Sequence, residues 1–340
     1  MRPSIVPTLL RDVVAVLALY ATAPADAGLF RSYLSLAGND ANPCTLQQPC
    51  RLLPAALAAV NPGGEIWMLD SANFNTSPVS ITKSVTILAV PGALGSIVAS
   101  GGDALVINAA GIKVALRNLV LLEFSGGANG IHFVQGAEVT VEECEIYGMP
   151  ANGVLAQASG GKLSMKNTVV RDNAQMGVQI AGNVTATLAR VHVLGNGTAG
   201  IGVSSGPKVT ISDSVIANHN ISGTSTGVTV ASAGGTQTQV VVERSVLSGN
   251  MFGAFAQTNN AGDNVQLAFS HDAITQNGTG YSAGGVASSV VNAVLDDDTI
   301  THNTTGVNVG FGVVTTRANN TFLFNASDVT GGALTTLTAQ

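Results

Sequence analysis

The hydrophobic and polar positions of this chain repeat one outline many times. Stretches such as "VTISDSVIAN" (209–218) and "VVVERSVLSGN" (240–250) alternate apolar and polar residues, break at one polar residue, and then resume with an apolar one. Alternation with a period of two is typical of a β-strand with one buried face. The break recurs every 22 to 31 residues, at Asn118, Glu143, Asn167, Arg190, Asp213, Arg244, His271, Asp297 and Asn319.

Apolar residues stand at fixed distances from each break. Nearly every repeat has one two residues before the break and one three residues after it, as with Ile211 and Ile216 around Asp213; the last repeat has Arg317 at the first of these positions. A third strand then opens with glycine, as in "GVQI" (177–180) and "GVTV" (227–230). So few residues separate the three strands that no crossover helix fits between them. The pattern predicts a parallel β-helix, all-β, with three strands in each of about nine or ten coils.

The polar residue at the break suits a bend in the chain, because Asn and Asp tolerate the left-handed backbone conformation. Six residues past most breaks stands a second polar column, in which His219 replaces asparagine once. Stacked amides one coil apart can pass hydrogen bonds along the axis. We therefore expect a structural ladder of Asn173, Asn196, Asn250, Asn277, Asn303 and Asn325.

The first 27 residues have the pattern of a secretory signal peptide. Arg2 and Arg11 supply a positive start, "VVAVLALYA" (13–21) a short apolar segment, and "ADA" (25–27) a small-residue cleavage site. A buried helix and an uncleaved anchor are the alternatives. The expected organisation is a signal peptide (1–27), an N-terminal capping segment with a helix (28–64), a parallel β-helix (65–330) and a C-terminal cap or tail (331–340).

This organisation predicts a secreted or periplasmic protein that leaves the membrane once the signal is removed. An oxidising compartment favours a disulfide between Cys44 and Cys50 in "CTLQQPC". Cys144 is left over, and we interpret it as a small buried thiol, the alternative being a reactive or intermolecular one. The net charge of −6, with only 14 basic residues scattered along the chain, argues against a nucleic-acid partner.

The repeats and the segment "NPCTLQQPCRLLPAALAAVNPGGEI" (42–66) resemble the bacterial secreted β-helix-repeat proteins of the pectin-lyase-like superfamily. The resemblance covers about residues 37–330 and implies a right-handed coil. Related enzymes cut acidic polysaccharides. The Gly-His-Gly and Arg-x-Lys motifs of the hydrolases and the Arg-x-Pro-x-x-Arg motif of the lyases are absent here, so no catalytic role is carried over from the family.

The breaks of four consecutive coils are the best catalytic candidates, because neighbouring coils place their Cα atoms within about 5 Å. A carboxylate beside a base could cleave a glycosidic bond, and a group of carboxylates could hold Ca²⁺. The alternative is an exposed corner whose opposite charges simply pair. The catalytic candidates are Asp213, Arg244, His271 and Asp297, and the metal-binding candidates are Asp272, Asp296, Asp297 and Asp298.

Aromatic residues that could stack on sugars are few. Trp67 either packs in the first coil or stacks on a sugar, Phe255 is expected to face outward, and Tyr147 and Tyr281 are expected in turns. Two functions remain open. The first is a non-catalytic extracytoplasmic rod of no assignable activity that binds polysaccharide. The second is a polysaccharide lyase or glycoside hydrolase acting on an acidic polysaccharide, with groove walls at 218–227 and 275–285.

Overall fold

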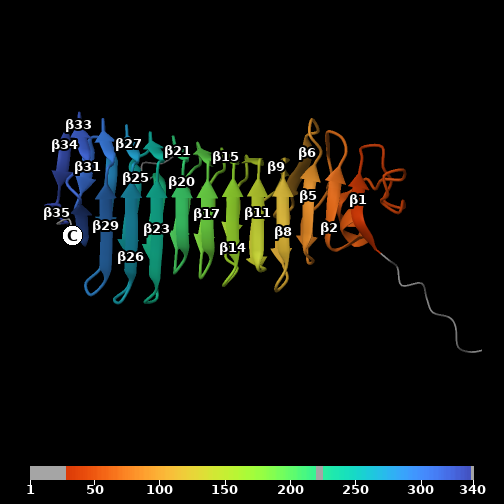
Figure 1. Cartoon of the computed structure of the whole chain (residues 1–340), viewed down its shortest axis with the longest axis horizontal. Coiled ribbons are helices and arrows are strands. Elements are labelled where there is room, and N and C mark those ends of the chain that lie inside the picture. Colours follow the sequence, from red (N-terminus) through yellow and green to blue (C-terminus); the bar gives the residue numbers. More distant parts are fainter. Residues whose placement is uncertain (1–27, 220–224, 338–340) are drawn as a thin grey trace, which may run out of the picture.

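The computed structural model describes residues 28–219 and 225–337, and in them the chain winds as a parallel β-helix (Figure 1). The expected signal peptide (1–27) and the middle of the 218–227 wall lie outside the described residues. All named strands pair in parallel into three sheets, and the described residues contain one short helix. The predicted fold class, an all-β parallel β-helix, is therefore confirmed.

Sheet A is the widest of the three and faces the viewer in Figure 1. Its 13 strands, in spatial order, are β1 (Leu29–Leu34), β2 (Val60–Met68), β5 (Val85–Ala89), β8 (Lys113–Arg117), β11 (Glu138–Glu142), β14 (Lys162–Lys166), β17 (Thr185–Ala189), β20 (Lys208–Ser212), β23 (Gln237–Glu243), β26 (Asn264–Ser270), β29 (Val290–Asp296), β32 (Val313–Thr316) and β35 (Thr335–Thr336).

Sheet B follows sheet A in each coil and consists mostly of three-residue strands. Its 11 strands are β3 (Ala72–Asn73), β6 (Gly95–Ser100), β9 (Leu119–Ser125), β12 (Glu145–Tyr147), β15 (Val169–Arg171), β18 (His192–Leu194), β21 (Val215–Ala217), β24 (Val246–Ser248), β27 (Ala273–Thr275), β30 (Thr299–Thr301) and β33 (Thr321–Leu323).

Sheet C completes each coil before the chain returns to sheet A. Its 11 strands are β4 (Val79–Ile81), β7 (Leu105–Asn108), β10 (Ile131–Gln135), β13 (Val154–Ala156), β16 (Met176–Ala181), β19 (Ala199–Ser204), β22 (Thr226–Ser232), β25 (Phe252–Thr258), β28 (Thr279–Gly284), β31 (Thr305–Asn308) and β34 (Ser327–Thr330).

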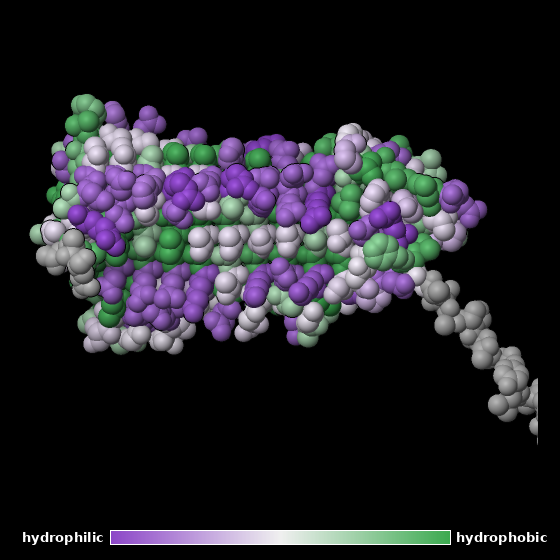
Figure 2. Space-filling model, in the orientation of Figure 1, coloured by the Kyte–Doolittle hydropathy of each residue, from purple (hydrophilic) through white to green (hydrophobic). Residues whose placement is uncertain are grey.

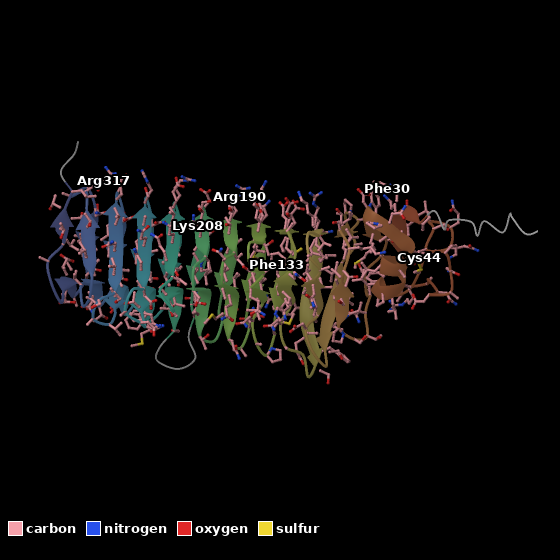
Figure 3. The ribbon with its side chains drawn as sticks, turned by 90° about the horizontal axis from the view of Figure 1, so that it is seen from below. Phe30, Cys44, Phe133, Arg190, Lys208 and Arg317 are labelled. Atoms are coloured by element: carbon pink, nitrogen blue, oxygen red, sulfur yellow. A yellow bond between two sulfur atoms is a disulfide. The ribbon has the colours of Figure 1, made fainter. Side chains whose placement is uncertain are left out.

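The inward residues of the three sheets form one continuous core along the rod. In all coils but the last, the apolar residues two before and three after the break, such as Ile211 and Ile216, are fully buried. Figure 3 shows Phe133 within the coil, whereas Arg190 and Arg317 lie at its edge. The alternation read from the sequence therefore separates core residues from surface residues as expected.

The N-terminal end of this core is covered by helix α1 (Leu53–Ala59). Its buried side chains are Leu53, Ala56 and Leu57, and they pack on the first coils. The helix lies within the expected capping segment (28–64), but that segment also contributes strands. Strand β1 pairs with β2 from Leu29 onward, because its alternating side chains also fit the sheet.

Several sequence-based expectations are wrong in detail, and one of the two alternatives for Trp67 does not hold. Tyr147 was expected in a turn but is the last residue of strand β12. Tyr281 lies in strand β28, not in a turn, and is fully buried with its ring edge on Phe269. The 275–285 segment therefore forms a strand of the coil and gives no groove wall at 279–284. Trp67 does not pack in the core: Ile66 and Met68 point inward, and Trp67 stacks under the Arg31 guanidinium at 4.0 Å.

Candidate functional site

The bend between sheets A and B has the left-handed backbone that the break column predicted. Its residues from Asn118 to Asp297 have φ between 48° and 59°. Asn319 is the exception. The last coil has one more residue between Thr316 and Phe322 than the previous coil has between Leu295 and Ile300, so Ala318 takes the bend, with φ 61°. Thr316, and not Arg317, therefore occupies the inward column.

The four catalytic candidates form two separate ion pairs on this exposed corner. The Arg244 guanidinium contacts Asp213 at 2.8 Å, and His271 Nε2 lies 3.3 Å from Asp297 Oδ2. This arginine holds the pKa of Asp213 below its ordinary value through a side-chain hydrogen bond. No contact joins the two pairs in the described residues. Ion pairing between neighbouring coils thus accounts for these residues without a catalytic role.

The four metal-binding candidates point to opposite sides of the backbone. Asp272 and Asp298 are buried, whereas Asp296 contacts Arg317 at 3.1 Å and Asp297 faces His271. No group of three or more His, Cys, Asp or Glu side chains in the described part of the chain could hold a metal ion. The four carboxylates therefore do not converge on one point, because the left-handed bend at Asp297 places Asp298 inward and Asp296 outside.

Asp272 and Asp298 instead belong to a ladder that the sequence analysis missed. Each backbone N–H just past the bend donates to the side chain one coil further on, for example from Ser245 to Asp272 Oδ1 at 2.7 Å and from Asp272 to Asp298 Oδ1 at 2.9 Å. Burial raises the pKa of Asp272 to about 7 and that of Asp298 to about 6. The ladder runs through Ser214, Ser245, Asp272, Asp298 and Asn320.

The asparagine column forms a second ladder at the bend between sheets B and C. In each step a backbone N–H donates to the side-chain oxygen of the next coil, as from Asn277 to Asn303 at 2.9 Å. All six expected asparagines take part: Asn173, Asn196, Asn250, Asn277, Asn303 and Asn325. His219 takes the place of one amide, with Nδ1 accepting from the Asn196 backbone. Burial lowers the pKa of His219 to about 4.

The glycines that open sheet C make room for this ladder. A Cβ on Gly177 would lie 2.8 Å from Asn196 Nδ2, and one on Gly200 would lie 2.4 Å from His219 Nε2. Neither glycine has a positive φ, so the close approach of the ladder side chain is the reason for glycine here.

The cysteines have separate environments. Cys44 and Cys50 form a disulfide next to α1. Cys144 is buried, and burial raises the pKa of its thiol to about 12, so it stays protonated. A thiol in this state is a poor nucleophile and metal ligand.

A group of polar residues where strands β7 and β10 of sheet C begin was also not predicted from the sequence. Asp103 Oδ2 accepts from Nδ1 of His132 at 2.7 Å, and Nε2 of His132 faces the Gln157 amide at 2.9 Å. The other oxygen of Asp103 accepts two bonds from Asn129, which in turn accepts from Asn152. These contacts begin a third ladder and hold the imidazole in one orientation.

The outer face of sheet A carries the candidate binding site. One hollow of about 480 Å³ extends over β17, β20, β23, β26 and β29, and a second of about 350 Å³ extends over β5, β8 and β11. Figure 2 shows a stripe of pale and hydrophobic residues along this face between two bands of hydrophilic residues. Small floor residues and longer rim residues therefore make these two shallow hollows, which lie in line along the rod with β14 between them, and we call them together the groove. Its middle column is Thr140, Ser164, Thr187, Thr210, Val241, Ala268 and Val294.

Comparisons with known proteins support the fold. Residues 103–270 match a family described as the right handed beta helix region. Solved structures similar to this chain include pectate lyase Pel9A, with 17% identity, a TM-score of 0.65 and coverage of 86% of this chain and 78% of that chain. The structure of XylC with xylose has 8% identity, a TM-score of 0.60 and coverage of 84% and 70%. A search of the curated proteins found no match.

No helix within residues 28–219 and 225–337 is long and apolar enough to cross a membrane.

The A-module of mannuronan C-5 epimerase AlgE6 from Azotobacter vinelandii is similar over 84% of this chain and 95% of its own, with 16% identity and a TM-score of 0.56. At these identities the structural likeness extends to the fold alone. The chain therefore has a right-handed parallel β-helix fold.

Proposed function

We propose that this protein is an extracytoplasmic rod that binds an extended polysaccharide chain along sheet A without cleaving it. The observation that carries the proposal is the groove on the outer face of that sheet, made of one hollow over β5, β8 and β11 and a longer one over β17 to β29 on the same line along the rod. A long, shallow groove fits a linear polymer better than a compact metabolite, whose binding site encloses most of its surface. The similar pectate lyase and mannuronan epimerase are named for polysaccharide substrates, which supports this class of ligand.

The groove also has the polar groups that sugar hydroxyls require. Thr187 and Thr210 lie on its floor, and Gln239, Gln266 and Asn292 line one side. Hydroxyl and amide groups both donate and accept hydrogen bonds, as sugars do. The Cys44–Cys50 disulfide and the N-terminal signal pattern support a location outside the cytoplasm.

A catalytic function is the weaker alternative. The ion pairs of Asp213 with Arg244 and of His271 with Asp297 satisfy all four candidate residues at the corner. Asp272 and Asp298 are buried in a ladder, where they contact backbone N–H groups and no groove. A lyase or hydrolase would need an acid or base that reaches the bound sugar.

Binding can be tested by titrating the purified protein with a panel of polysaccharides in a calorimeter. Thr210→Arg places a long side chain on the groove floor, and we expect it to weaken binding by about tenfold or more, which corresponds to about 1.4 kcal/mol. Thr229→Arg on the outer face of sheet C is the matched control and should bind like the wild type.

Cleavage is measured on the same panel through reducing ends and through the absorbance of unsaturated products. We expect neither signal to rise above the buffer control. If products appear and Asp297→Ala abolishes them, the protein is an enzyme and the non-catalytic proposal is wrong. If no polysaccharide binds, the assignment of the groove is wrong.

A further inference from the structure

The groove of sheet A is divided into zones of different charge. On β14 and β20 the outward residues include Lys162, Lys166 and Lys208, all exposed. The other outward residues of β14, β17 and β20 are serine, threonine and alanine. Lys162 and Lys166 stand in register with Glu138 and Glu142 of β11, but these glutamates pair with Lys113 and Arg117 on the far side. None of the three lysines forms an ion pair within the described residues. We call Lys162, Lys166 and Lys208 the cationic zone.

Elsewhere on sheet A the basic side chains are neutralised. Lys113 pairs with Glu138 at 3.6 Å and Arg117 with Glu142 at 2.8 Å. At the two ends, Arg31 pairs with Glu65 and the Arg317 side chain with Asp296. Three lysines without an ion pair, two on β14 and one on β20 with β17 between them, are therefore a local exception in a protein with a net charge of −6. Unpaired cations in one place mark a site for an anionic group.

The part of the groove beyond this zone is neutral. Gln239, Gln266 and Asn292 stand in register on β23, β26 and β29, and Gln239 Nε2 donates to Gln266 Oε1 at 2.7 Å. They line the larger hollow together with Val241 and Ala268. We call Gln239, Gln266 and Asn292 the amide row. It offers hydrogen bonds to hydroxyl or acetamido groups and offers no charge to a carboxylate.

We infer that the ligand is a mostly neutral polysaccharide that carries a sparse anionic substituent. This inference rests on the proposed function. From β17 to β29 the larger hollow spans four coil spacings, about 19 Å, and Lys162 and Lys166 stand one coil before it, so several sugars lie along it together. A polyuronate would place a carboxylate on every sugar, including those over the amide row, where no cation replaces the lost hydration. A polymer with one acid in each repeat can place that acid on the cationic zone and neutral sugars on the amide row.

The experiment compares three polymers by calorimetry at two salt concentrations: gellan, which has a single uronate in each repeat; polygalacturonate, which has one on every sugar; and dextran, which is neutral. Gellan should bind tightest to the full protein. The variants Lys162→Gln and Lys208→Gln should weaken it and flatten its salt dependence. Gln239→Ala and Gln266→Ala should weaken it by a similar factor, about tenfold for the pair, with the salt dependence unchanged.

Two matched variants control for nonspecific effects. Arg317→Gln removes a cation outside the cationic zone, and Gln179→Ala removes an outward amide on sheet C; both should bind gellan like the wild type. Polygalacturonate binding at least as tightly as gellan, or insensitivity to the Gln239 and Gln266 changes, would overturn the inference while leaving polysaccharide binding intact. Absence of binding to all three polymers and to the wider panel would instead count against the proposed function itself.

Discussion

At the scale of single residues, the ladders contain two kinds of titrating group with opposite responses to pH. His219 is buried and its pKa is lowered to about 4, so the folded protein binds fewer protons than the unfolded chain between about pH 4 and 6.5. Its contribution to stability is present above the unfolded pKa and is lost as pH falls through this window. Asp272 has a pKa raised to about 7, and its contribution is present at low pH and lost as pH rises through 7.

Single substitutions should separate these two effects. His219→Asn restores an amide to the ladder, and we expect its free energy of unfolding to fall less than that of the wild type on acidification from about pH 7 to 4. Asp272→Asn should have the reverse effect: it removes a stabilising contribution that grows on acidification, so its free energy of unfolding should fall more than that of the wild type over the same range. Each group changes the slope by up to about 1.4 kcal/mol per pH unit within its window.

Denaturant unfolding at a series of pH values measures these slopes. Thr229→Ser on the outer face of sheet C removes no titrating group and is the control, so its slopes should match those of the wild type. If the new amide at position 272 packs less well, stability falls by the same amount at every pH. The slopes are therefore unaffected by this loss. Identical slopes for the wild type and both ladder variants would show that these groups titrate normally in the folded protein.

The inward position of some ladder residues could have been predicted from the sequence. The apolar residue three positions after each bend implies that the residue directly after the bend also points inward, because strand side chains alternate. That position holds Ser214, Ser245, Asp272 and Asp298. The pattern could therefore have placed two aspartates inside the coil. It could not show which hydrogen bonds satisfy them, since those bonds join residues 26 and 27 positions apart on neighbouring coils.

At the scale of elements, the glycines of sheet C set how closely a strand approaches the asparagine ladder. A Cβ on Gly177 would lie 2.5 Å from Val193 Cγ1 and 2.8 Å from Asn196 Nδ2. Real carbon atoms are not found so close, so either the strand or the ladder amide must move. Displacing the amide would leave a buried polar group without its partner.

We therefore expect Gly177→Ala to destabilise the protein by about 1–3 kcal/mol. Gly284→Ala is the matched control in the same sheet, because a Cβ there would meet only Phe255 at 3.4 Å, an ordinary contact. Thermal unfolding followed by circular dichroism compares the two variants. Equal changes in stability in both variants would show that clearance for the ladder amide is not what requires glycine at position 177.

The apolar positions that recur around each bend explain why most strands could be predicted from the sequence. Every coil places an apolar residue before and after a left-handed bend, so local pattern and tertiary fold agree. The last coil departs from this pattern, because one extra residue near Ala318 shifts the left-handed bend away from Asn319. The groove was not predictable either. Its lysines and glutamines look like any outward residue of a strand until the register brings them together.

At the scale of the whole molecule, the rod is quasi-one-dimensional, because each coil contacts mainly the coils before and after it. Stability should then be distributed locally. The N-terminal coils depend on α1, whose Leu53 is fully buried, whereas the middle coils depend on their own inward residues such as Ile211. The larger hollow lies over β17–β29, far along the chain from the helix.

This arrangement predicts that a substitution that destabilises the N-terminal coils does not destabilise the distant coils. Leu53→Ala removes buried methyl groups at a cost of about 2–5 kcal/mol. Each coil contacts mainly its two neighbours, so this loss of stability should remain local. Hydrogen exchange should accelerate in β1, β2 and β5 and stay unchanged in β20–β29. Polysaccharide binding should persist. Ile211→Ala removes a comparable side chain from β20 and should accelerate exchange there and reduce binding. If Leu53→Ala lowered protection uniformly, the coils would unfold as one cooperative unit, and the stability of the groove would depend on the cap.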